Sequence, residues 1–169
     1  IRELAVQGSN GTLSGSDRIV IAQEVSSLRD ALFSLANTED ESGNYIFSGT
    51  SVKTPAFSKD GQGVISYNGD QNQTSVDISE NRQVKVNRPG DAIFNSVMRS
   101  NDDGTTTSIG FFSVLSDFTD ALESGSDADI SKGLTEISEL TNEMTLSLAD
   151  VGSRMNTVDR QRDILVDTK

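Results

Sequence analysis

Residues 14–36 read SGSDRIVIAQEVSSLRDALFSLA, a polar start followed by apolar residues at regular intervals. The apolar positions recur with alternating spacings of four and three, which keeps one narrow stripe on a single face of an α-helix. They are Ile21, Val25, Leu28, Leu32 and Leu35. The side-chain oxygens of Ser14, Ser16 and Asp17 suit the N-cap of a helix. The spacing therefore predicts a helix that follows this cap, ends near Asn37 and packs its stripe against a partner helix.

The same heptad spacing occupies the last part of the chain, from Asp127 to Lys169. Its apolar members are Ile130, Leu134, Ile137, Met144, Leu148, Val151, Met155, Val158 and Leu165, with Thr141 and Arg162 at the seam positions between them. Gly133 and Gly152 each weaken such a helix by about 1 kcal/mol relative to Ala. Because a helix of this length is not stable through propensity alone, we expect it to have partners along its length.

A shorter helix precedes this one, with Phe111, Leu115, Phe118 and Leu122 on one face and a stop at Gly125. Since helices that return from an insert run antiparallel to the helix that enters it, we expect the N- and C-terminal helices to pair side by side. The predicted helical core packing comprises Ile21, Val25, Leu28, Leu32, Leu35, Ile137, Met144, Leu148, Val151, Met155 and Val158. The pattern at both ends leads us to expect helical elements that continue beyond Ile1 and Lys169.

Between the helices the apolar period drops to two, which is typical of β-strands. We predict strands at 45–49, 64–67, 75–78 and 83–86, with a hairpin around the polar segment 68–73. Phe57, Ile65, Tyr67, Ile78 and Val86 would form a thin core there, and residues 101–104 with the Ser/Thr run after them read as a surface loop.

These elements predict an α+β fold, an elongated antiparallel helical bundle with an inserted small β module. Residues 1–44 and 107–169 would form the helical core domain, and 45–106 a β-rich outer domain.

Composition excludes several classes of function. The chain of 169 residues holds 26 Asp and Glu against 14 Lys and Arg, a net charge of −12, and no basic run. Nucleic acid and anionic lipid surfaces require clustered Lys and Arg, so we expect neither as a partner. With no Cys and no His, the usual zinc sites, thiol nucleophiles and the commonest general base are absent. We therefore expect no cofactor and no bound metal.

An enzyme would have to use carboxylates, and the densest pairs are Asp102 with Asp103 and Asp127 with Asp129. Neighbouring residues point apart, and these four lie in a loop or at a helix start, where Asp is favoured for turns and caps. The sequence thus predicts no catalytic residue, and a structural subunit in place of an enzyme. An adhesive, carbohydrate-binding β module is an alternative, but its aromatic residues are few and would be needed for its own core.

Several motifs carry a resemblance to a known family. Residues 2–7 (RELAVQ), 10–14 (NGTLS) and 151–156 (VGSRMN) resemble the conserved helical core of bacterial flagellins. The segments 43–49 (GNYIFSG), 54–57 (TPAF), 67–70 (YNGD), 84–87 (VKVN) and 90–94 (GDAIF) are more similar to flagellar hook-associated proteins of the hook–filament junction. The motifs occur in the right order over nearly the whole chain.

This resemblance implies a structural subunit of the bacterial flagellum, exported by the flagellar type III apparatus and located outside the cell. The implied partners are the other hook-associated junction protein, flagellin, an export chaperone, and further copies of the chain in a helical tubular lattice. A flagellin with a reduced outer domain is the alternative. We expect the subunit interface to use Arg2, Arg18, Arg29, Arg154, Arg160 and Arg162.

Overall fold

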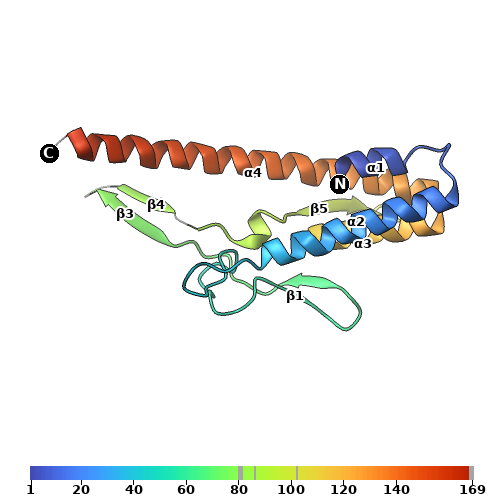
Figure 1. Cartoon of the computed structure of the whole chain (residues 1–169), viewed down its shortest axis with the longest axis horizontal. Coiled ribbons are helices and arrows are strands. Elements are labelled where there is room, and N and C mark those ends of the chain that lie inside the picture. The colour runs from blue at the N-terminus through green and yellow to red at the C-terminus, as the bar shows by residue number, and fades with distance from the viewer. Residues whose placement is uncertain (80–81, 86, 102, 168–169) are drawn as a thin grey trace.

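The computed structural model describes residues 1–79, 82–85, 87–101 and 103–167. These residues form four α-helices and three pairs of short strands (Figure 1). The helices are α1 (Arg2–Gly8), α2 (Gly15–Ala36), α3 (Phe111–Ser124) and α4 (Asp127–Asp167). The strands are β1 (Phe57–Lys59), β2 (Ile65–Tyr67), β3 (Ser75–Ser79), β4 (Arg82–Lys85), β5 (Ser96–Ser100) and β6 (Thr106–Gly110), with a 3-10 turn, η1, at Gly90–Ala92.

Local sequence sets the helix ends. The Ser14 hydroxyl accepts a hydrogen bond from the Asp17 backbone N–H, and the Asp17 carboxylate accepts one from the Ser14 N–H. This capping box starts α2 where the sequence predicts it. Gly125 has φ of +74° and ends α3 in the left-handed conformation that glycine adopts without strain. Ser126 then caps α4 through the Asp129 N–H. The predicted start of α2 and end of α3 are confirmed.

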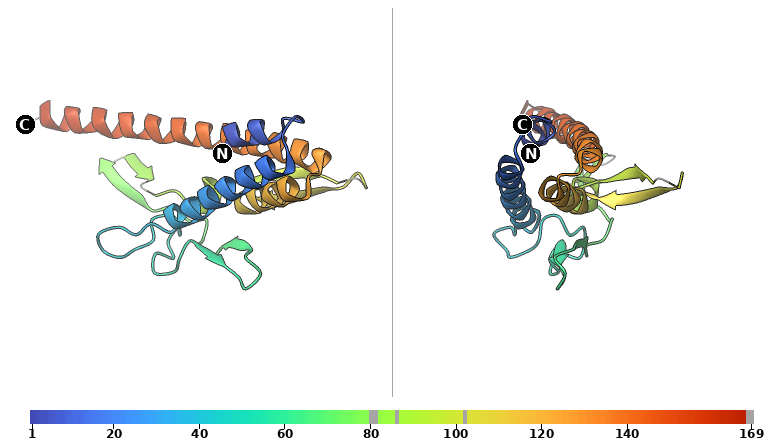
Figure 2. Two further views of the ribbon diagram at one scale, coloured as in Figure 1. Left: turned by 45° about the vertical axis from the view of Figure 1, so that its right-hand side comes forward. Right: turned by 90° about the vertical axis from the view of Figure 1, so that its right-hand side faces the viewer.

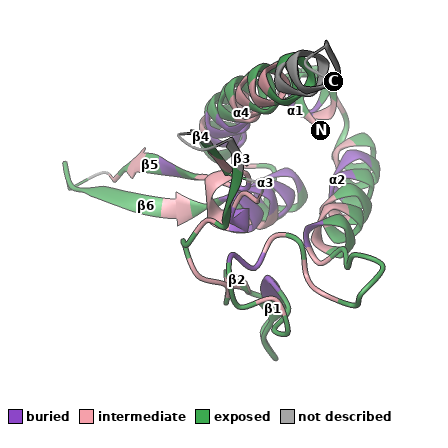
Figure 3. Cartoon of the chain, turned by 90° about the vertical axis from the view of Figure 1, so that its left-hand side faces the viewer, coloured by how far each residue is buried: buried purple, intermediate pink, exposed green. Residues whose placement is uncertain are grey.

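The four helices lie roughly parallel to one long axis, with α3 between α2 and α4 (Figure 3). Helix α2 runs antiparallel to α3, and α1 runs antiparallel to α4, against which it packs (Figure 1). The expectation that the long N- and C-terminal helices pair with each other is therefore wrong for α2 and α4. The tight turn at Gly125 reverses the chain a second time, so α4 runs in the same direction as α2 and meets α3 and α1 instead.

The core of the bundle is centred on α3. Phe118, Leu115, Leu122 and Val114 are almost fully buried, and Ile21 and Val25 of α2 pack on them together with Ile130, Ile137 and Leu140 of α4. Leu32 and Met144 are half-buried at its edge. Helix α3 has 14 residues and spans about 21 Å, whereas α4 has 41 and spans about 62 Å. The bundle therefore covers only part of α4, and the rest extends beyond it (Figure 2).

This difference in length corrects the predicted core. Six of the predicted core residues are exposed and not buried, because no helix of the described chain lies over them. They are Leu28 at 37% exposure, Leu35 at 60%, Leu148 at 72%, Val151 at 39%, Met155 at 62% and Val158 at 42%. Leu165, also predicted in the seam, lies outside the residues whose side chains are described.

The β part consists of three separate antiparallel hairpins, β1–β2, β3–β4 and β5–β6, within the described residues. The predicted strand at 45–49 is wrong, since only an isolated bridge joins Tyr45 to Glu39. The predicted hairpin around 68–73 is also wrong, because β2 pairs back with β1 and β3 pairs forward with β4. The predicted loop after Asn101 is a turn that leads directly into β6, so this hairpin runs past residue 106 to Gly110. The predicted core residues Ile78 and Val86 lie outside the description of side chains.

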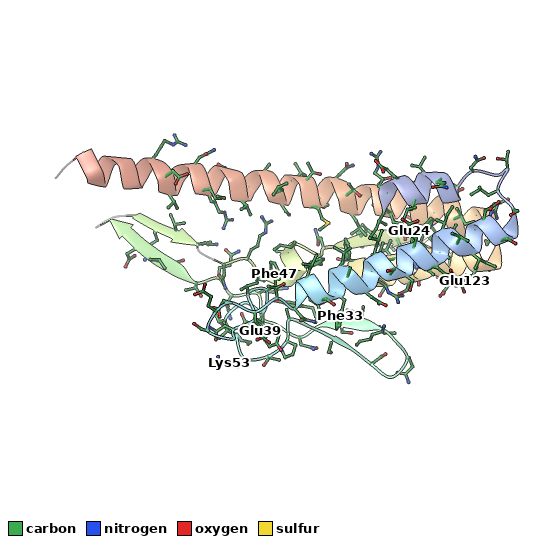
Figure 4. The ribbon with its side chains drawn as sticks, viewed as in Figure 1. Glu24, Phe33, Glu39, Phe47, Lys53 and Glu123 are labelled. Carbon is green, nitrogen blue, oxygen red and sulfur yellow. The ribbon has the colours of Figure 1, made fainter. Side chains whose placement is uncertain are left out.

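An aromatic cluster joins the loops after α2 to the bundle. The Phe57 ring centroid lies 5.2 Å from that of Phe112 in α3, 5.4 Å from Phe94 and 5.2 Å from Tyr67. Phe33 near the end of α2 and Phe47 in the loop flank the cluster (Figure 4). The loops thus share the hydrophobic core of the helices, in place of the thin separate core that the sequence suggests. The domain boundaries at 45 and 106 stay a prediction.

Asp70 organises the polar segment between β2 and β3. Its carboxylate accepts hydrogen bonds from the backbone N–H of Thr50 at 3.0 Å, the Thr50 hydroxyl at 2.7 Å and the Ser51 hydroxyl at 2.8 Å. These bonds, led by the Thr50 N–H, hold the pKa of Asp70 well below its usual range. The Tyr67 hydroxyl donates to the Asp70 carbonyl at 2.8 Å, and burial together with the nearby Asp91 charge raises the pKa of Tyr67 to about 12.

This carboxylate should make the chain sensitive to acid. Because folding lowers the pKa of Asp70, its stabilising contribution is complete above the unfolded pKa of about 3.9 and is lost as pH falls through the lower folded pKa. We expect the melting temperature of the wild type to fall with pH in this acidic window, and that of Asp70→Asn to be lower at neutral pH and to change less with acid. Thermal unfolding at a series of pH values measures both. Parallel pH profiles for the two proteins would contradict the assignment.

Candidate assembly surface

An apolar groove of about 540 Å³ runs between α2 and α4, with the start of α3 as its floor. Leu28, Ala31, Leu32 and Leu35 line it from α2, Phe111 and Leu115 from α3, and Ile137, Leu140, Thr141 and Met144 from α4. Ile1, Arg2 and Glu3 close one end. The groove arises because the apolar faces of α2 and α4 both face it. Helix α1 reaches the groove only at the end formed by Ile1, Arg2 and Glu3. Besides the buried Leu115 and Leu140, the groove presents Leu28, Leu32, Leu35 and Met144, which the bundle leaves half-buried or exposed.

The groove continues along the overhanging half of α4. Met144 lines both the groove and a neighbouring depression of about 400 Å³ that holds Leu148 and Val151, and Val151 leads on to a third with Met155 and Val158. We define the apolar strip as Leu28, Leu32, Leu35, Met144, Leu148, Val151, Met155 and Val158. Leu148 and Met155 are its most exposed members. A continuous row of exposed apolar side chains such as this strip is more typical of an interaction surface than of a face in contact with water.

Arg88, just after β4, holds the second hairpin beneath this half of α4. Its guanidinium donates to the Asp150 carboxylate at 3.0 Å and to the Ser147 carbonyl at 3.4 Å. Arg154 pairs with the same carboxylate at 2.8 Å, four residues along the helix. The two arginines therefore place charged groups at the border of the apolar strip.

Two of the arginines predicted at a subunit interface make contacts within the chain. Arg18, whose side chain is 12% exposed, donates to the Gly125 carbonyl at 3.3 Å and to the Asp127 carboxylate at 2.9 Å. It thereby ties α2 to the turn between α3 and α4. Arg29 donates to the Ser116 hydroxyl of α3 at 2.9 Å. The charge pattern of α2 does not reveal these partners, because they lie about a hundred residues away in the sequence.

The other predicted interface residues have different positions. Arg2 lies at the closed end of the groove and is exposed. Arg154 borders the apolar strip, and the exposed Arg160 donates from Nε to the Asn156 carbonyl at 3.1 Å. Arg162 lies outside the residues whose side chains are described. The structure thus brings Arg2 and Arg154 to the surface that carries the apolar strip, although at separate places along it.

Sequence reasoning missed a second polar cluster. Arg99 of β5 makes two parallel hydrogen bonds of 2.7 Å to Glu136 of α4, and it also pairs with Asp117 of α3. Glu136 is only 5% exposed. Hydrogen bonds to both carboxylates raise the pKa of Arg99 above its usual range. This fork joins the β5–β6 hairpin to two helices. Residues alternate between the two faces of a strand, so a strand predicted at 96–100 would have placed Arg99 on the same face as the apolar Val97. That placement could have indicated a partly buried arginine.

The acidic pairs considered for catalysis have ordinary structural roles where they are described. Asp103 accepts from the Thr105 hydroxyl and N–H, Asp127 pairs with Arg18, and Asp129 binds the Ser126 hydroxyl. Asp102 lies outside the described residues. Among the residues described, no group of three acidic side chains is arranged to hold a metal ion. Nor does any helix there combine the length and the apolar character that crossing a membrane requires.

Comparison with known proteins gives consistent relatives. Residues 1–52 match the bacterial flagellin N-terminal helical region. Flagellar hook-associated protein 3 of Escherichia coli K12 is 30% identical over 171 residues, covering 94% of this chain and 53% of the relative. The protein of the same name from Salmonella typhimurium is 28% identical, covering 89% and 48%. Flagellin C of Vibrio anguillarum is 39% identical over 57 residues, 34% of this chain. The chain spans about half the length of the two hook-associated relatives.

Solved structures show the same fold. FlgL of Xanthomonas campestris superposes with a TM-score of 0.86 at 20% identity, covering 99% of this chain and 84% of that one. The flagellar junction protein FlgL of Legionella pneumophila gives a TM-score of 0.82 at 17% identity, with coverage of 99% and 82%. These superpositions show a shared fold, a helical core with small antiparallel hairpins, while the sequence matches support a structural protein of the flagellin superfamily. Within that superfamily, the sequence matches over nearly the whole chain support a protein of the FlgL type.

Proposed function

We propose that this chain belongs to a structural subunit of the bacterial flagellum that joins a hook-associated protein on the hook side to the flagellin filament. One observation carries the proposal. The match to hook-associated protein 3 covers 94% of the chain, whereas the match to flagellin C covers 34%. The alternative, a flagellin with a reduced outer domain, rests on the match of residues 1–52 to the flagellin helical region.

The partners follow from the same proposal. The subunit would lie outside the cell after export through the flagellar type III apparatus, with an export chaperone for the full-length protein. It would contact the other junction protein, flagellin and further copies of itself in a helical tubular lattice. The apolar strip supports a helix-mediated contact of this kind, because buried apolar area is the main favourable term in most protein association.

A complementation experiment tests the junction role. The full-length protein that contains this segment is supplied to cells that lack their own junction protein, and filaments attached to hooks are counted by electron microscopy. We expect attached filaments and restored swimming. Filament growth only in cells that lack flagellin would support the flagellin alternative and contradict the junction role. Export without attachment in either strain would contradict both.

Leu148→Asp separates assembly from folding. Because Leu148 is 72% exposed, the variant should change the free energy of unfolding by no more than about 0.5 kcal/mol. The same variant should reduce attached filaments, since a carboxylate in a buried contact lacks a partner. Urea unfolding of the purified chain and filament counts in the complemented cells measure the two effects.

Leu146→Asp is the matched control, because Leu146 is 65% exposed on the same helix but lies on another face, outside the apolar strip. We expect this control to keep both stability and attachment. Equal filament loss in the two variants would argue against the strip as the contact.

A further inference from the structure

The chain contains two Asn–Gly dipeptides, and the structure packs their glycines differently. Asn10–Gly11 lies in the connection between α1 and α2, and Asn68–Gly69 lies just after β2. Asparagine is a thermally labile residue. It is most labile before glycine, because no side chain then hinders the next backbone nitrogen as it approaches the asparagine carboxamide. The sequence alone does not distinguish the two positions.

The two positions differ in the free space around the glycine. Both asparagines are exposed, but a Cβ added at Gly11 would meet no heavy atom within 4 Å. A Cβ added at Gly69 would lie 2.4 Å from the Tyr67 hydroxyl oxygen and 2.8 Å from the Ser48 Cα. In the part of the chain that the structure describes, neither the Gly11 N–H nor the Gly69 N–H donates a hydrogen bond, so the packing around the glycine is the difference. The backbone at Gly11 therefore has the room and the free N–H that a ring closure needs, whereas packing holds the backbone at Gly69.

Thr12 adds a chemical contribution at the first position. The Asn10 Oδ1 accepts hydrogen bonds from the Thr12 backbone N–H at 3.1 Å and from the Thr12 hydroxyl at 2.9 Å. When a nucleophile attacks the carboxamide carbon, negative charge develops on Oδ1. Two donors already directed at that oxygen stabilise the charge in the manner of an oxyanion hole.

We propose that Asn10 is a site of spontaneous covalent modification, through a succinimide that its own backbone forms. The Gly11 nitrogen loses its proton and bonds to the Asn10 Cγ. The bond from Cγ to Nδ2 breaks, and Nδ2 takes up that proton and leaves as ammonia. One water molecule then opens the ring at either carbonyl, which yields aspartate or isoaspartate at position 10. The overall reaction consumes one water molecule and releases one ammonia molecule, with no oxidation or reduction.

The modification would act on α1. Ser9 is the C-cap of this helix, and a new carboxylate one residue further on interacts unfavourably with the negative end of the helix dipole. An isoaspartate also reroutes the main chain through the side-chain carbon, which alters the connection to α2. Helix α1 seats the fully buried Ala5 in the core. Ageing at Asn10 should therefore loosen α1 from α4, and amide hydrogen exchange in residues 2–8 should become faster.

Incubation of the purified chain in mildly alkaline buffer tests the proposal, with peptide mapping by mass spectrometry and fragmentation that separates aspartate from isoaspartate. We expect conversion at Asn10 while Asn68 remains intact, and faster conversion as pH rises, since the attacking amide must lose its proton. In denaturant the two asparagines should convert at similar rates. Equal rates in the folded chain, or a slow Asn68 that persists in denaturant, would overturn the assignment to packing.

Two variants isolate the chemistry. Thr12→Val keeps the shape and the backbone donor but removes the hydroxyl, and should slow conversion about 2- to 10-fold, the effect of one net hydrogen bond. Gly11→Ala places a methyl group in open space, so the chain should fold unchanged while conversion becomes slower. An unchanged or faster rate in Thr12→Val would show that Thr12 does not assist. An unchanged rate in Gly11→Ala would exclude attack by this nitrogen.

Discussion

Replacement of Arg99 with alanine should lower the free energy of unfolding by about 3–5 kcal/mol, the usual cost of removing one partner from a buried ion pair. The reason is Glu136, which is 5% exposed and whose two carboxylate oxygens are both bound by the Arg99 guanidinium. Without Arg99 this carboxylate is buried with no counter-charge. The exposed side of the cluster, Asp117, contributes less because water already reaches it.

Urea unfolding followed by circular dichroism measures this loss, and two further variants separate its causes. Arg99→Lys keeps the charge but not the planar fork, so it should recover only part of the stability. Arg99→Met combined with Glu136→Leu replaces the pair with apolar side chains and should lie much closer to the wild type than Arg99→Ala does. A loss below about 1 kcal/mol for Arg99→Ala would place the cluster among surface ion pairs.

Replacement of Phe118 with alanine should also cost about 3–5 kcal/mol, the range for a fully buried phenylalanine. Its ring is 0% exposed at the centre of the bundle, between α2 and α4. Removal leaves a cavity that the surrounding helices close only in part. Thermal or urea unfolding gives the value, and Thr119→Ala on the same helix provides a milder comparison because it removes only a local hydrogen bond to the Leu115 carbonyl.

Phe118 also explains the glycine that faces it. A Cβ at Gly133 would lie 2.5 Å from the Phe118 ring. Gly133→Ala should therefore be destabilising by about 1–3 kcal/mol through overpacking, although helix propensity alone favours Ala by about 1 kcal/mol. Gly152→Ala is the control, since nothing lies within 4 Å of that position, and it should stabilise. In the Phe118→Ala background, Gly133→Ala should also become stabilising. Destabilisation that persists there would contradict the proposed clash.

Gly133 and Gly152 illustrate how far the sequence can be read. Both lie in the same helix, and helix propensity alone predicts that each weakens it equally. One is required by a phenylalanine that lies 15 residues earlier in the sequence, and the other has open space around it. The two Asn–Gly dipeptides and the arginines of α2 show the same limit, because identical local chemistry acquires different roles from distant neighbours.

Features that depend on nearby residues can be read from the sequence. The capping box of Ser14 and Asp17, the left-handed stop at Gly125 and the cap at Ser126 place the helix ends, and the alternating spacing identifies the apolar face of each helix. The ordered motifs also indicated the flagellin-like relatives that comparison then found.

Which parts of each apolar face are covered depends on the path of the folded chain. A periodic stripe requires a partner, but the partner's length and position depend on where the chain reverses. The tight turn at Gly125 sets a 14-residue α3 against a 41-residue α4, so Ile130 and Ile137 are buried while Leu148 and Met155 face solvent. The partners of Arg18, Arg29 and Arg99 likewise lie far from these arginines in the sequence. Their proximity is a property of the folded path, which local periodicity does not encode.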